Sequence, residues 1–86
     1  MEKQEDLKFP VVWSYRIITD AAAERCPAEL QTVLDRVGGG VKLQPSHDSR
    51  GGRYRAYAAP VTVNSREELE NVSNELAAVE GVRFLL

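Results

Sequence analysis

The chain has 86 residues and a formal net charge of −2, which is enough for one domain built around a single core. This length excludes an enzyme of two lobes, and the slightly negative charge disfavours non-specific binding to a phosphate backbone. The only cysteine, Cys26, leaves no internal disulfide and no set of thiolates for a structural zinc ion.

The N-terminal residues 1–8 are almost wholly charged or polar. We expect a mobile tail there, because such a segment buries too little apolar surface to offset the entropy lost on ordering. This polar start does not resemble a secretory signal, and no apolar stretch approaches the ~20 residues that span a bilayer. With the single cysteine, these features predict a cytoplasmic protein.

The first half of the domain reads as strand, helix, strand. Residues 9–19 are rich in β-branched and aromatic side chains that alternate with period two, which predicts a strand. Pro27 suits the first turn of a helix whose apolar positions recur at helical spacing and which glycines 38–40 end. Residues 41–45 alternate apolar and polar and predict a short second strand.

The second half reads as strand, helix, strand. Residues 53–64 predict a third strand, and Ser65 with Glu68 predicts a capping box at the start of a second helix. An apolar stripe runs along that helix to Val79, Gly81 stops it, and Val82, Phe84 and Leu86 mark a last strand.

This order predicts one α+β domain over residues 9–86 with a ferredoxin-like βαββαβ fold. Each helix has one apolar stripe, so both pack on one face of a four-stranded antiparallel sheet of order 4-1-3-2. Pro60 then falls in a central strand, where it cannot donate to the ladder. We therefore expect a bulge at Ala59 and Pro60, and a regular ladder there would contradict this strand order.

The sheet face turned away from the helices is predicted to be only weakly polar, which indicates that something covers it. A second copy of the domain is the simplest candidate, and the last strand adds apolar side chains on both of its faces. The alternative is that Leu85 is merely half-buried. The candidate interface residues are Val12, Ser14, Arg16, Ile18, Tyr54, Ala56, Ala58 and Leu85.

Two motifs have the residue types of catalysis without the partners that catalysis needs. Cys26 stands at a helix start, where the helix dipole favours a thiolate, but no base accompanies it. His47 and Asp48 lie in a turn and have no preorganised nucleophile. The sequence therefore predicts a non-enzymatic protein without a metal or cofactor.

The residue types allow two kinds of binding site, one for an anion and one for nucleic-acid bases. The run Ser49, Arg50, Gly51, Gly52 and Arg53 offers backbone N–H groups and guanidinium groups to an anion, although a plain hairpin connection needs the same residues. Stacking of nucleic-acid bases is less favoured. Trp13 and Tyr15 alternate in step with Ile17 and are expected in the core. This leaves Tyr54 as the only aromatic residue on the sheet face turned away from the helices.

Several short motifs are distributed along residues 9–86: Phe9-Pro10, Tyr15-Arg16-Ile17, the turn from Ser49 to Gly52 with Tyr54 after it, Asn64-Ser65, Glu75-Leu76 and the C-terminal Val82 to Leu86. In their order and spacing they resemble the YbeD-like family of small bacterial proteins. The resemblance implies a ferredoxin-like fold related to regulatory ACT domains, with no established activity.

ACT-like modules pair through their sheets and bind small metabolites beside the loop between the first strand and the first helix. Residues 25–30 look like that loop, with Arg25 at its start, but Ala28 stands where a ligand-approaching glycine is usual. Thr19 likewise replaces a glycine that is frequent in YbeD-like proteins. Both departures remove the close backbone approach that glycine allows.

We therefore predict a regulatory or protein-interaction module that acts as a dimer or with another protein partner. The alternative is a module that senses a small metabolite, and a nucleic-acid binder is less favoured.

Overall fold

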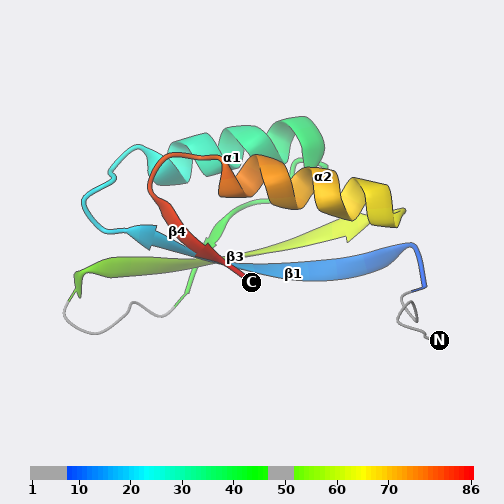
Figure 1. Ribbon diagram of the computed structural model, residues 1–86, viewed down its shortest axis with the longest axis horizontal. Helices are drawn as coiled ribbons and strands as arrows, with labels where there is room; N and C mark the ends of the chain where they lie inside the picture. Colours follow the sequence, from blue (N-terminus) through cyan, green and yellow to red (C-terminus); the bar gives the residue numbers. More distant parts are fainter. Residues whose placement is uncertain (1–7, 47–51) are drawn as a thin grey trace.

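The computed structural model describes residues 8–46 and 52–86, which contain four strands and two helices (Figure 1). The strands are β1 (Val11–Asp20), β2 (Gln44–Pro45), β3 (Tyr54–Val63) and β4 (Val82–Leu85), and the helices are α1 (Cys26–Val37) and α2 (Arg66–Ala77). The predicted tail, apart from Lys8, and residues 47–51 of the predicted turn lie outside the described residues.

The two long strands carry the alternation that the sequence predicts. Tyr15, Ile17 and Thr19 of β1 are buried on one face, while Ser14 and Arg16, which alternate with them, are exposed. On β3 the matching buried positions are Ala59, Val61 and Val63, each fully buried. These side chains form the sheet side of the core, and the next residues along each strand point to the opposite face.

Both helices lie on the same face of the sheet, as Figure 1 shows, and supply the other side of the core. Leu30 and Leu34 of α1, with Val72 and Leu76 of α2, are fully buried there. Burying each such side chain contributes about 1.5–3 kcal/mol to folding. Within the described part of the chain, neither helix is long and apolar enough to cross a membrane.

The start of α2 is capped as the sequence predicts, with one difference. Ser65 Oγ accepts a hydrogen bond from Glu68 N at 3.0 Å, which satisfies a backbone donor of the first turn. The Glu68 carboxylate reaches back to Asn64 N at 2.6 Å, one residue before the expected Ser65 N. The cap therefore fixes the chain on both sides of Ser65.

The second strand is shorter than predicted, because a helix side chain replaces strand pairing over residues 41–43. Gln31 of α1 donates from Nε2 to Val41 O at 2.9 Å, and its Oε1 accepts from Leu43 N at 2.8 Å. The backbone of this segment is therefore held by α1, and only Gln44 and Pro45 pair with β3.

The four strands form one antiparallel sheet of order β2-β3-β1-β4, which confirms the predicted ferredoxin-like topology. The bulge expected at Ala59 and Pro60 is wrong. Ser14 lies opposite Pro60 and Tyr15 opposite Ala59 in a register that runs without a shift along the whole of β3.

The direction of the Pro60 nitrogen explains why a regular ladder tolerates this proline. Ser46 N donates to Ala56 O at 2.8 Å, so the backbone groups of Ala56 point toward the β2 edge. In a strand the backbone groups of every second residue point to the same edge, so the Pro60 nitrogen does too. β2 pairs only with Tyr57 and Ala58, and no ladder bond is lost at Pro60. The predicted strand order and this proline are compatible.

Candidate functional site

The sheet face opposite the helices carries exposed apolar side chains from β1, from β4 and from the residue after β4. The exposed large hydrophobic residues of the described chain are Val12, Phe84 and Leu86, at 58%, 60% and 70% exposure. Phe84 lies opposite Ile18, and Leu86 exchanges backbone hydrogen bonds with Arg16. Directly opposite residues place their side chains on one face, so all three belong to the face of Val12, Arg16 and Ile18. We call this surface the open face.

Most of the predicted interface residues lie on the open face. Across the ladder from Arg16 and Ile18 stand Ala58 and Ala56, and Tyr54 stands opposite Asp20. Ala56 is only 7% exposed, although it faces away from the helices, opposite Ile18.

A shift in the pairing of β4 decides which of its apolar side chains reach the open face. Val82 lies opposite Thr19 and Phe84 lies opposite Ile18, so Arg83 has no residue opposite it. Val82 packs against the core, whereas Phe84 and Leu86 point to the other face. Leu85 packs on the helix side and is half-buried, so it lies outside the open face.

Sequence reasoning missed Phe84 and Leu86 because simple alternation places them on the same face as Val82. The structure also corrects the prediction that Tyr54 is the only aromatic residue on the open face, since Phe84 lies there as well. No signal in the sequence marks the extra residue of β4, because it is defined only by the pairing of β4 with β1.

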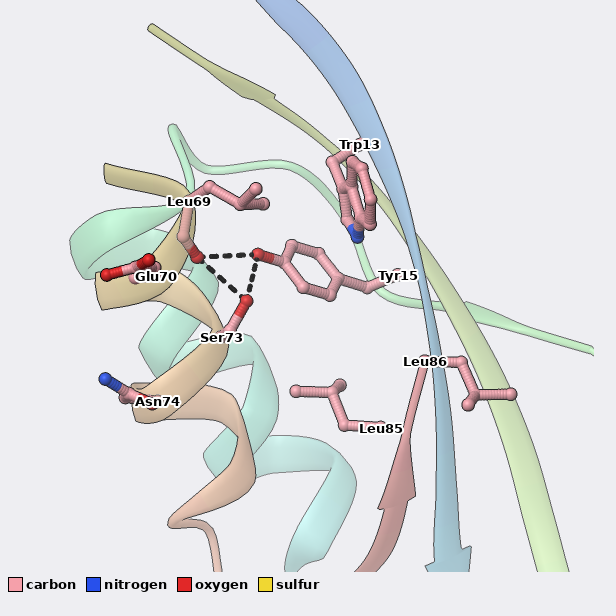
Figure 2. Close-up of a pocket in the computed structure, with 8 residues that line it drawn as sticks. All are labelled: Trp13, Tyr15, Leu69, Glu70, Ser73, Asn74, Leu85 and Leu86. Atoms are coloured by element: carbon pink, nitrogen blue, oxygen red, sulfur yellow. Dashed lines mark hydrogen bonds between the residues drawn. The ribbon is translucent and has the colours of Figure 1, made fainter. Parts of the chain in front are cut away.

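A groove of about 370 Å³ lies between α2 and the edge of the sheet formed by β1 and the end of β4 (Figure 2). Its lining combines aromatic and aliphatic side chains with a polar rim on α2. The lining residues are Trp13, Tyr15, Leu69, Glu70, Ser73, Asn74, Leu85 and Leu86. Figure 2 shows Leu85 on the helix side of the sheet and the Leu86 side chain on the far side of β1.

The back of this groove is fixed by a hydrogen-bonded group of three oxygens. Tyr15 Oη lies 3.1 Å from Leu69 O and 2.7 Å from Ser73 Oγ, and Ser73 Oγ lies 2.8 Å from Leu69 O, so two hydroxyl protons serve three contacts. Burial raises the pKa of Tyr15, and the hydrogen bond to Ser73 offsets part of that rise. The phenol therefore stays neutral and ties β1 to α2. Trp13 and Tyr15 both lie on the helix side, as their parity predicts.

The residues proposed for ligand binding are divided among separate places. Thr19 is 1% exposed and lies in the core beneath the loop that follows β1. Arg25 lines a hollow of about 350 Å³ beside Cys26 and Glu29. Gly52 and Arg53 line another of about 350 Å³ on the other side of the loop. Ser49, Arg50 and Gly51 lie outside the described residues.

Arg83 joins Arg53 at the second of these hollows, together with Asp20. The two arginines are thirty positions apart in the sequence. They come together because β3 and β4 both pair with β1 and both begin at the same end of the sheet. Arg83 is the residue left without a partner by the register shift of β4. It is a second candidate cation for the anion site predicted at Arg53.

Cys26 is buried at the start of α1, and its surroundings oppose thiolate formation. Burial raises the pKa of the thiol, and the nearby Glu29 carboxylate raises it further. His47 and Asp48 lie outside the described residues. Within the described ranges, no group of three or more histidine, cysteine, aspartate or glutamate side chains is arranged to hold a metal ion.

The sequence is similar to curated bacterial proteins over almost its whole length. UPF0250 proteins of Shewanella sediminis and Shewanella loihica are each 33% identical over 82 residues, which is 95% of this chain and 92% of theirs.

Solved structures with low sequence identity share the fold. The solution structure of protein HP0495 from H. pylori superposes with a TM-score of 0.74 at 18% identity, over 98% of this chain and 89% of that one. The C-terminal domain of the MgtC protein from Mycobacterium tuberculosis gives a TM-score of 0.57 at 17% identity, over 93% and 88% of the two chains.

Residues 4–86 match the family described as "Protein of unknown function (DUF493)". This match and the UPF0250 relatives agree with the YbeD-like resemblance of the short motifs. The chain therefore belongs to the DUF493/UPF0250 (YbeD-like) family of small bacterial proteins of unknown function.

Proposed function

We propose that this protein is a non-enzymatic interaction module that pairs with a second copy of itself through the open face of its sheet. The observation that supports this is the placement of Val12, Phe84 and Leu86, each more than half exposed, on one face of the sheet, with Phe84 opposite Ile18. In a solvated sheet these positions normally carry polar side chains. Covering them removes apolar surface from water, and this favours association.

The size of the open face sets the strength expected of such a dimer. With ten residues in each of β1 and β3 and only four in β4, the sheet presents roughly 400 Å². A stable interface typically buries about 800 Å² on each partner. The dimer is therefore expected to be weak and to form at protein concentrations of tens of micromolar or more.

Light scattering coupled to size-exclusion chromatography tests this proposal over a range of protein concentrations. The unmodified protein should rise toward twice the monomer mass as concentration increases. Phe84→Glu should remain monomeric, because it replaces the exposed aromatic side chain of the open face with a charge. Ala28→Glu is the matched control, since it adds the same charge to the exposed side of α1 and should still dimerise. A monomer at every concentration removes the dimer from the proposal.

A second candidate function is the sensing of a small anionic metabolite at the hollow beside the loop after β1. Two guanidinium groups, those of Arg53 and Arg83, line this hollow together with Gly52. Planar guanidinium groups bind carboxylates and phosphates in two-point geometry. A thermal-shift screen of amino acids, nucleotides and acyl metabolites should find compounds that raise the melting temperature. Arg83→Gln should abolish that rise, and a flat screen counts against this function.

A further inference from the structure

We propose that the free edge of β1 and the groove beside it bind an extended, basic peptide segment of another protein by strand addition. This inference goes beyond self-association, because it uses the edge of the sheet and its helix side, not the open face. Three observations support it: unpaired backbone on β1, an apolar groove next to that backbone, and a negative rim.

The first observation is that β4 pairs with only half of β1. β4 pairs with Ile17, Ile18 and Thr19 of β1. Arg16 and Leu86 then exchange two backbone hydrogen bonds, of 3.1 and 2.9 Å, which are the last on this edge in the described chain. Since Arg16 points its N–H and C=O toward β4, the alternation of the strand points those of Ser14 and Val12 to the same edge. These groups are a template for one more strand segment.

The second observation is that the groove begins where these free backbone groups lie. Trp13 and Tyr15 project from the same stretch of β1 into the groove, with Leu69 on the opposite wall (Figure 2). A segment paired with Ser14 and Val12 directs every second side chain to the helix side, where the groove lies. Its volume of about 370 Å³ accommodates a large aliphatic side chain.

The third observation decides what kind of segment fits. Glu70 and Asn74 of α2 form the rim, and no cation pairs with Glu70 among the described residues. A lysine or arginine next to the inserted apolar side chain would meet this carboxylate. The occupant is therefore an extended segment in which an apolar side chain is flanked, at alternate positions, by basic ones.

The same charges disfavour a second copy at this edge. Antiparallel pairing of two β1 edges would continue the sheet and set the two α2 helices side by side. Each copy would bring its own Glu70 to this interface, and no cation pairs with Glu70 among the described residues. Like charges brought together across such an interface oppose association, whereas a basic peptide is attracted. Self-association is thus assigned to the open face and peptide binding to the edge.

The experiment uses synthetic seven-residue peptides and the fluorescence of Trp13, the only tryptophan in the chain, which lines the groove. The probe has lysine, leucine and lysine separated by single threonines, with threonine at both ends. It should change the Trp13 emission saturably. Replacing both lysines by glutamate should weaken binding by about tenfold or more. Titration of the Phe84→Glu protein should give the same affinity, so the outcome is independent of the dimer.

Methylation of the peptide backbone tests strand addition directly. One probe is N-methylated at its lysines and leucine, and the other at its threonines. Because alternate residues of an extended peptide point their N–H groups to the same edge, each probe has lost the N–H donors of one peptide edge. Only one of these two probes should lose binding, by about tenfold or more, because only one peptide edge faces β1. Ser14→Pro in the protein removes a free N–H of the edge and should weaken binding to a similar extent, whereas Ser14→Thr should not.

The rim is tested with two substitutions that change the net charge equally. Glu70→Lys should weaken binding of the lysine probe by about fivefold. Glu80→Lys, on an exposed residue that lines a different hollow, should leave the affinity within about twofold.

Four results would overturn the proposal. One is the absence of a saturable change in Trp13 emission at millimolar peptide. Another is equal binding, or equal loss of binding, of the two methylated probes. The third is an equal effect of Glu70→Lys and Glu80→Lys, which indicates long-range charge only. The last is dissociation of the dimer by the probe, which would mean that a second copy occupies the edge.

Discussion

At the scale of single residues, Tyr15 shows how one side chain serves both the core and the groove. Its ring is buried in the helix-side layer, while its hydroxyl reaches Leu69 O and Ser73 Oγ on α2. A buried hydroxyl without a partner costs free energy, so the position favours tyrosine only because α2 presents these two oxygens. The strand pattern predicts burial of Tyr15 but not these partners, which lie more than fifty positions away in the sequence.

The first residue-scale prediction concerns the hydroxyl of Tyr15. Tyr15→Phe removes the hydrogen bonds of the Tyr15 hydroxyl and should lower the free energy of unfolding by about 1 kcal/mol. The loss is no larger because the Ser73 hydroxyl still donates to Leu69 O and is not left unpaired. Urea denaturation measures this change. Tyr57→Phe is the matched control and should change stability by less than about 0.5 kcal/mol, since no hydrogen bond to the Tyr57 hydroxyl occurs in the described structure. Equal effects of the two substitutions would contradict the assigned role.

The raised pKa of Tyr15 adds a pH dependence with a defined sign. The folded protein holds the phenolic proton more tightly than the unfolded chain, whose tyrosine has the ordinary pKa of 10.0. The contribution to stability is complete below that pH and is lost as pH rises through the folded pKa. Above pH 10 the unmodified protein should therefore lose stability more steeply than Tyr15→Phe.

At the scale of elements, the turn between α2 and β4 packs closely against the start of α1. Gly81 has φ of +100°, and a Cβ atom at this position would meet Ala23 Cβ at 2.6 Å and Cys26 Sγ at 3.3 Å. Gly81 O also accepts from Asp20 N at 2.8 Å. These contacts tie the start of β4 to the end of β1 and to the start of α1.

Gly81→Ala should therefore be more destabilising than the same substitution at another glycine with positive φ. We expect a loss of about 3 kcal/mol, from strain in the left-handed conformation and from the contact with Ala23. Gly39→Ala is the matched control, because Gly39 has φ of +74° with open space around it, and it should cost about 1 kcal/mol. Thermal unfolding followed by circular dichroism compares the two, and a similar cost for both would rule out the packing contribution.

At the scale of the whole molecule, one sheet with both helices on the same side leaves two different surfaces for the proposed interactions. The open face combines the exposed Val12, Phe84 and Leu86 with the polar Ser14 and Arg16, and we propose that it meets the same face of a second copy. In the described chain the β1 edge has backbone groups without a neighbouring strand, an apolar groove and the Glu70 carboxylate on its rim, and we propose that it binds an extended basic segment. The hollow with Arg53 and Arg83 is at the end of the sheet where β1 leads into its loop, because β1 pairs with both strands that carry these arginines.

The sequence determined the helices, the long strands and the order of strands in the sheet. These follow from local periodicity, from the cap at Ser65 and from the rules that govern right-handed crossovers. The faces of β1 and β3 were predicted as well, because ten alternating residues in each strand leave little ambiguity in parity.

Only the tertiary structure decided the ladder at Pro60, the faces of Phe84 and Leu85, and the meeting of Arg83 with Arg53. Each depends on contacts between segments distant in sequence: a neighbouring strand that ends before Pro60, the shifted pairing of β4 with β1, and two strands paired to the same partner. Periodicity in one segment carries no information about where its neighbour stops. For this reason the core could be predicted from the sequence, whereas the groove beside β1 and the hollow with Arg53 and Arg83 could not.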